Sequence, residues 1–217
     1  MAAAPTRELS RGAGGGGKVD RVNDVDERIA SALEKIHQAQ RSLIWEVSTR
    51  EKLSPIQIQF LLHLDRFPAE QRTVSALARE FDLSKPTVSD ALVPLEVKGL
   101  ISRKTNEEDR RSAILALTAK GKKKLAALGD WRGALVDAVS GFSAAEKEAA
   151  LKFLAGVIER LFEEGVVSVA RMCTACEHYR PGDSRHRCAL TGRGFGDGGI
   201  NVGCVNYSLP PGVVRDE

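Results

Sequence analysis

Apolar residues recur every three to four positions along most of this chain, which is the spacing of helices with one buried face. The pattern predicts helices over roughly residues 24–50, 55–67, 73–80, 85–98, 119–139 and 144–165. Two short apolar segments, roughly 100–104 and 112–117, predict strands joined by a polar hairpin. The chain is therefore expected to be mainly α, with one small β ribbon.

Helix starts are marked by side chains whose oxygens accept hydrogen bonds from N–H groups of the first turn. These predicted caps are Asp24, Ser54, Thr73, Ser84, Thr118 and Ser143. Glu146 follows Ser143 at the spacing of a capping box. The caps support the helix assignments independently of the apolar pattern.

Three regions differ in composition. Residues 1–22 are rich in Ala, Gly, Arg and Ser and predict a disordered tail. Residues 23–165 carry the helices and the ribbon, and residues 166–217 predict a small cysteine-rich, metal-binding segment. The chain is 42% hydrophobic and 28% charged with a net charge of +3, as in ordinary globular proteins. With no membrane-length apolar run and no export signal at its start, we expect a cytoplasmic protein without membrane contact.

A helix, a short turn, a second helix and a hairpin make a winged helix-turn-helix, whose second helix suits the major groove of DNA. The hairpin can place arginine in the minor groove. The predicted DNA-binding residues are Ser84, Lys85, Thr87 and Ser89 on the second helix, and Arg103, Arg110 and Arg111 on the wing. No catalytic constellation accompanies them, so we do not expect an enzyme.

The wing carries a more specific pattern. Residues 109–121 match D-x-R-x-x-x-L-x-L-T-x-x-G, and residues 97–101 match the segment before the wing. Over about 25–165 the chain resembles the MarR family of bacterial transcription regulators. The resemblance implies a homodimer that binds a pseudo-palindromic operator and acts as a repressor. It also implies dimerisation through the first and last helices, where the apolar candidates are Phe153, Leu154, Ile158, Leu161 and Phe162.

The only four cysteines lie near the C-terminal end, in the spacing C-x2-C-x11-C-x15-C: Cys173, Cys176, Cys188 and Cys204. Without an export signal, such a group predicts a metal site rather than two disulfides. Four thiolates can hold either zinc or a [4Fe–4S] cluster. Structural zinc sites usually bring two close cysteine pairs, whereas here only Cys173 and Cys176 are close, which favours the cluster.

The same segment resembles high-potential iron–sulfur proteins. These proteins have an aromatic residue in the spacing C-x2-aromatic after the last cysteine, and this chain has Tyr207 there. The sequence departs from them at Gly203, where they usually have an aromatic residue. We therefore expect a [4Fe–4S] redox sensor that modulates DNA binding. The alternative is a structural zinc site in a regulator that responds to a small aromatic ligand, bound in a cleft near His37, Arg41, Trp45 and Trp131.

Overall fold

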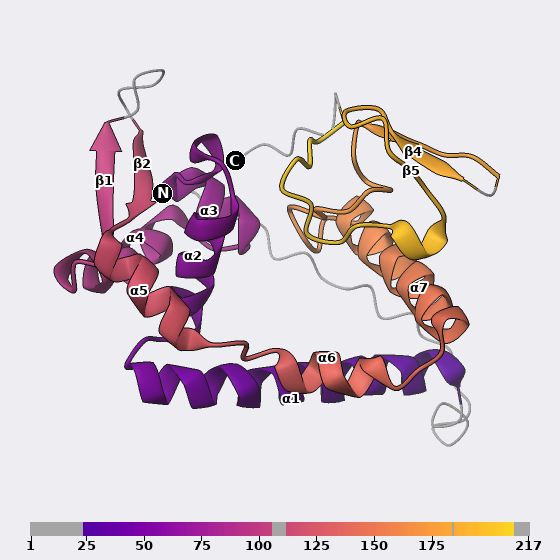
Figure 1. The fold of residues 1–217 in the computed structure, drawn as a ribbon, viewed down its shortest axis with the longest axis horizontal. Coiled ribbons are helices and arrows are strands. Elements are labelled where there is room, and N and C mark those ends of the chain that lie inside the picture. Colours follow the sequence, from indigo (N-terminus) through magenta and orange to yellow (C-terminus); the bar gives the residue numbers. More distant parts are fainter. Residues whose placement is uncertain (1–23, 106–111, 184, 211–217) are drawn as a thin grey trace, which may run out of the picture. The chain divides into compact units, whose positions relative to one another are not determined.

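The computed structural model describes residues 24–105, 112–183 and 185–210. The elements, drawn in Figure 1, follow one another in this order: α1 (Val25–Glu51), α2 (Pro55–Arg66), η2 (Ala69–Gln71), α3 (Val74–Glu80), α4 (Lys85–Val97), β1 (Ile101–Thr105), β2 (Ala113–Leu117), α5 (Ala119–Leu128), α6 (Gly133–Ser140), α7 (Ala144–Glu163), β3 (Tyr179–Arg180), β4 (His186–Cys188), β5 (Gly194–Phe195) and η3 (Asp197–Gly199). The chain divides into two compact units, Met1–Ser42 and Leu43–Glu217. The contacts described below lie within the second unit.

The predicted helix starts are confirmed. Ser54, Thr73, Ser84, Thr118 and Ser143 all cap their helices through the side-chain oxygen. Ser143 and Glu146 form the predicted capping box. One prediction was wrong: the basic helix expected to reach residue 139 ends at Leu128, and α6 begins separately at Gly133. Gly129 has a positive φ of 65°, a left-handed conformation that ends a helix.

The first hydrophobic core joins the end of α1 to α2, α3, α4, the ribbon and α5. Its fully buried members include Phe60, Leu77, Val88, Leu92, Leu95 and Leu115. The antiparallel strands β1 and β2 pair from Ile101↔Leu117 to Thr105↔Ala113. The Leu115 N–H donates to the Arg72 carbonyl at 2.7 Å, so the middle of β2 is attached to the segment that precedes α3. This core holds α4 and the wing as one body.

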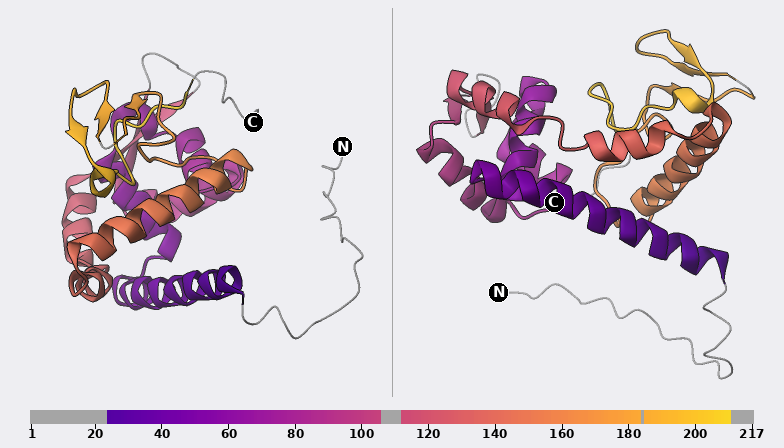
Figure 2. Two further views of the ribbon diagram at one scale, coloured as in Figure 1. Left: turned by 90° about the vertical axis from the view of Figure 1, so that its right-hand side faces the viewer. Right: turned by 60° about the horizontal axis from the view of Figure 1, so that its bottom comes forward.

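A second core forms between α7 and the C-terminal segment, which lie against each other in Figure 2. Its buried members are Ala155, Phe162, Ala170, Met172, Ala175, Phe195, Ile200 and Tyr207. Lys152 of α7 also pairs with Asp197 at 2.7 Å. Because α7 supplies part of this core, the core continues across the boundary predicted near residue 165.

The helix α7 thus has two apolar faces. Phe162 is buried in the second core and Ile158 packs against it, so these two residues face the C-terminal segment of their own chain. Phe153, Leu154 and Leu161 remain exposed in the single chain. Only these three of the five candidate dimer residues are available to a partner.

His63 is a polar residue inside the first core, 3% exposed and stacked on Phe67 with ring centroids 4.3 Å apart. Its Nε2 lies 2.9 Å from the Gln71 carbonyl oxygen, which fixes this nitrogen as the protonated one of a neutral ring. Burial lowers the pKa of His63 to about 4. The folded chain therefore holds this imidazole neutral where an unfolded chain would protonate it.

We predict that acid destabilises the protein through His63. Between pH 6.5 and pH 4 the unfolded chain binds a proton that the folded chain does not, so stability falls as pH falls through this window. The loss should be about 2 kcal/mol between pH 7 and pH 5, measured by urea unfolding. His63→Phe should flatten this dependence, whereas His37→Gln on the exposed side of α1 should keep it. Equal pH slopes in wild type and His63→Phe would contradict the assignment.

Candidate nucleic-acid interface and cysteine cavity

The first turn of α4 presents three of the predicted DNA-binding residues to solvent. Ser84, Lys85 and Thr87 are exposed, and Ser89 is half-buried one turn further on. The Ser84 Oγ accepts from the Thr87 N–H at 3.2 Å and lies 2.7 Å from the Thr87 hydroxyl. Ser84 is therefore a helix cap, and it fixes the position of Thr87.

The opposite face of α4 anchors the helix. Val88, Leu92 and Leu95 are each 0% exposed in the first core. Because the apolar side of α4 is fixed in the core, the polar side of its first turn has a defined orientation. A recognition helix needs such an orientation to contact base edges. The structure thus brings the four predicted residues of α4 together.

The wing residues are only partly described. Arg103 lies on β1, and its Nε pairs with Glu96 Oε1 of α4 at 2.6 Å. The Arg103 side chain in this exposed pair therefore points towards the end of α4, where Glu96 is its partner. Arg110 and Arg111 lie outside the described residues, so their predicted role stays a prediction.

The four cysteines, which the sequence indicates as metal ligands, lie close together in the structure. All four are free thiols, and all four line one cavity of about 50 Å³. Met172, Tyr179 and Phe195 supply apolar walls beside them. Cysteines that are far apart in the sequence thus share one largely apolar space.

Backbone turns hold each cysteine in place. The Cys173 N–H donates to the Asn201 carbonyl at 3.1 Å, and the Asn201 N–H lies 3.3 Å from the Cys173 Sγ. Cys188 sits at the end of β4, where its N–H donates to the Arg193 carbonyl at 2.9 Å. The Cys204 N–H donates to the Arg171 carbonyl at 3.0 Å. An N–H directed at a thiol sulfur favours the thiolate, the form that binds metals.

The thiols differ in their electrostatic surroundings. Burial raises the pKa of the Cys173 thiol, with the other three cysteines adding to the effect. The Thr191 hydroxyl hydrogen-bonds to Cys188 and lowers the pKa of that thiol. A buried thiol with a raised pKa becomes a thiolate readily once a cation binds beside it, because the metal compensates the charge.

The size of the cavity bears on which group it suits. One zinc ion draws four sulfurs to about 2.3 Å from the metal and leaves no space between them. A cavity of about 50 Å³ exceeds the ~10–15 Å³ needed for one water-sized occupant. Among the described residues, no three Cys, His, Asp or Glu side chains are arranged to hold a single metal ion. The described residues thus place four thiols around one small, largely apolar cavity.

The two nearby histidines differ in their availability. His186 uses both ring nitrogens, with Nδ1 2.9 Å from the Tyr179 hydroxyl and Nε2 2.8 Å from Asp197 Oδ1. His178 lines the cavity and approaches Glu177 at 3.4 Å. His186 therefore supports the wall of the cavity as a hydrogen-bonded side chain.

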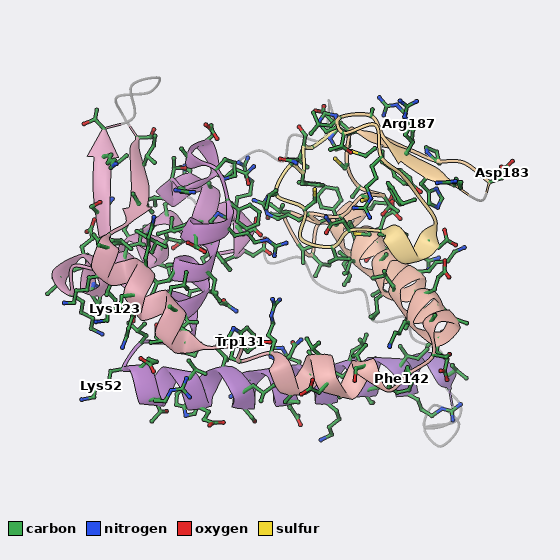
Figure 3. All side chains as sticks on the ribbon, viewed as in Figure 1. Lys52, Lys123, Trp131, Phe142, Asp183 and Arg187 are labelled. Carbon is green, nitrogen blue, oxygen red and sulfur yellow. The ribbon has the colours of Figure 1, made fainter. Side chains whose placement is uncertain are left out.

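A second cavity was not predicted from the sequence. It has a volume of about 430 Å³ and is lined by Glu51, Lys52, Leu53, Lys98, Leu100, Lys120, Lys123, Lys124 and Ala127. Lys124 pairs with Glu51 at 2.7 Å, which lowers the pKa of that carboxyl. Figure 3 shows two of these lysines, Lys52 directly after α1 and Lys123 on α5. Five lysines around an apolar floor suit an organic anion, and these residues differ from the cleft residues that the sequence indicated.

None of the helices in the described parts of the chain is long and apolar enough to cross a membrane.

Comparison with known proteins identifies the winged helix. The model of the MarR family matches residues 52–112. A DNA-bound structure of the transcriptional repressor CouR is 26% identical, covers 64% of this chain and 96% of its own, and has a TM-score of 0.51. The Staphylococcus aureus MepR–DNA complex is 23% identical, with 61% and 97% covered and a TM-score of 0.52. A MarR transcriptional regulator from Methanosarcina mazei Go1 is also 23% identical, with 64% and 97% covered and a TM-score of 0.50.

Proposed function

We propose that this chain, whose residues 52–112 match the model of the MarR family, is a sequence-specific DNA-binding transcription regulator that acts as a repressor. The observation that carries the proposal is the first turn of α4. Its polar side is exposed while its apolar side is fixed in the core. Ser84, Lys85, Thr87 and Ser89 contact the major groove, and the wing with Arg103, Arg110 and Arg111 follows the adjacent minor groove.

The regulator acts as a homodimer on a pseudo-palindromic operator. Exposed apolar side chains on α6, on α7 and in the connection between them support this part of the proposal: Val136, Val139, Phe142, Phe153, Leu154 and Leu161. Such a concentration of large apolar residues on two consecutive helices marks an interaction surface. A two-fold dimer matches a DNA site with two half-sites.

The test separates base contacts from phosphate contacts on a duplex selected by the protein from a random pool. Thr87→Ala should relax discrimination between variants of this duplex, where each base pair normally contributes about 1–3 kcal/mol. Lys122→Ala on α5 should instead weaken binding to all variants by a similar factor. A uniform loss in both variants would contradict the assignment of α4 as the recognition helix.

We further propose that Cys173, Cys176, Cys188 and Cys204 hold a [4Fe–4S] cluster and that this cluster makes the regulator a redox sensor. The cavity that the four thiols share, its apolar walls and the wide spacing of Cys188 and Cys204 in the sequence support this choice over zinc. When bound, the cluster supplies one-electron redox chemistry and a site that oxidants destroy. Protein purified without oxygen should be brown with a broad absorption band, whereas colourless protein with stoichiometric zinc would overturn the choice.

A second candidate function has one observation in its favour. The 430 Å³ cavity combines several ammonium groups with an apolar floor, which suits a small aromatic acid. In this alternative the cysteines hold a structural zinc ion, and the acid is the signal. Wild-type protein would then bind an aromatic carboxylate such as benzoate competitively with DNA, and Lys123→Ala would weaken that effect.

A further inference from the structure

Arg171 stands between the cysteine cavity and the helix-turn-helix. Its carbonyl accepts hydrogen bonds from the Gly203 N–H at 2.7 Å and the Cys204 N–H at 3.0 Å. Its φ is 46°, a left-handed conformation that is uncommon for a residue with a side chain. Arg171 also precedes Cys173 by two residues. Its backbone therefore belongs to the turn that positions two of the four cysteines.

The side chain of Arg171 extends from this turn to α3 and to the end of α2. Its Nε lies 2.5 Å from Glu80 Oε2, and the two side chains are only 11% and 17% exposed. Its guanidinium carbon lies 4.2 Å from the centroid of the Phe67 ring, at the end of α2. A charged pair shielded from water, with one partner stacked on an aromatic ring, interacts far more strongly than a surface pair.

Glu80 is the last residue of α3, and only four residues separate it from α4. Asp82 in this connection has a φ of 51°, and its Oδ1 accepts from the Ser168 N–H at 2.9 Å. The C-terminal segment thus holds two points of the turn that sets the direction of α4. If the Arg171 side chain moved away, the shielded carboxylate of Glu80 would lose its charged partner, which is energetically unfavourable.

We propose that Arg171 is a positioning residue that transmits the state of the cysteine cavity to the α3–α4 turn of the same chain. This inference rests on the proposed function. With the cluster bound, the turns at residues 171–173 and 203–204 are fixed, and Arg171 holds Glu80. When the cluster is lost these turns relax, Arg171 withdraws, and the start of α4 changes its position against DNA. The α3–α4 turn is the two-state element that both sites affect.

Arg66 makes a further contact across the same boundary, and Arg180 supplies a control that does not cross it. Arg66 Nη2 donates to the Gly203 carbonyl at 2.5 Å, in an exposed position. Arg180 donates only within its own segment, to the carbonyls of Glu177 and Tyr179. Arg180→Met thus removes a guanidinium near the cavity without changing the link to α3.

The experiment measures the affinity for the selected duplex of anaerobically purified protein and of the same protein stripped of its cluster, at one salt concentration. We expect a ratio between about 5 and 150 in the wild type, the usual range of coupling between two sites. Arg171→Met should keep the cluster absorption per chain but reduce the ratio below about 2. Glu80→Gln, which lies outside the segment, should do the same, and Arg180→Met should keep the wild-type ratio.

The outcomes separate the two proposals. Equal affinities in the wild type would overturn both the sensing function and the role of Arg171. A large ratio in the wild type that persists in Arg171→Met and Glu80→Gln would overturn the role of Arg171 alone. If Arg171→Met fails to bind the cluster, Glu80→Gln decides the question, because its substitution leaves the turns around the cysteines in place.

Discussion

Replacing Gly121 with alanine should destabilise the winged helix by about 3 kcal/mol, because the new methyl group has no space. A Cβ at this position would lie 2.0 Å from the Leu100 carbonyl oxygen and 3.3 Å from the Leu117 side chain. The obstacle is backbone, which cannot rotate away as a side chain can. The Leu100 carbonyl also accepts from the Thr118 N–H at 3.0 Å, so moving it disturbs the junction between β2 and α5. Thermal unfolding should show a decrease in Tm of roughly 10 °C.

Gly133→Ala is the matched control. Gly133 begins α6, and its added Cβ would meet only the Asp130 side chain at 3.6 Å, an ordinary contact. This substitution should change stability by less than about 0.5 kcal/mol. Equal melting temperatures for both variants would mean that α5 does not approach Leu100 as closely as the structure has it.

Gly121 illustrates what the sequence could reveal about the winged helix. The motif over residues 109–121 ends on this glycine, and the close approach to Leu100 gives the physical reason for it. Helix caps and apolar periodicity located α2, α3, α4 and both strands within one or two residues. These signals are local, and local signals suffice where each helix has one buried face and a side-chain cap.

The break between α5 and α6 was not predicted, because the local signals around it continue the helical pattern. Residues on both sides of Gly129 favour helix, and apolar periodicity continues across it. One glycine inside a helical pattern costs only about 1 kcal/mol, so it does not by itself end a prediction. Gly129 has a positive φ and the neighbouring Leu128 is 2% exposed, and neither the backbone conformation nor this packing is visible in the sequence.

The C-terminal segment could be predicted in its chemistry but not in its packing. Residue type and spacing placed the four cysteines at one site, and the structure brings them to one cavity. That α7 supplies Ala155 and Phe162 to the core of this segment could not be predicted, because the apolar face of α7 fits a dimer interface equally well. The pairing of Arg171 with Glu80 joins residues 91 positions apart, and no local pattern marks it.

Cys188→Ala should remove the bound cluster and unfold the segment that holds it. Binding of a structural metal group contributes on the order of 10 kcal/mol, comparable to the whole stability of a domain. The second core is small and depends on turns fixed at Cys173 and Cys204. We expect the variant to lose the visible absorption and to become sensitive to protease beyond about residue 165. The first core shares no buried residue with the second, so the winged helix should stay resistant.

Thr174→Val is the matched control for this prediction. Thr174 lies between Cys173 and Cys176, and its buried hydroxyl has no hydrogen-bond partner among the described residues. Removing an unpaired buried hydroxyl while keeping the side-chain shape should be neutral or slightly stabilising. This variant should therefore keep the absorption and the protease resistance of the wild type. A Cys188→Ala protein that lacks the cluster and still resists protease beyond residue 165 would show that the second core folds without it. The cluster would then act as a sensor without stabilising the fold of the segment. Loss of the cluster would have to change the position of α4 through a conformational change smaller than unfolding.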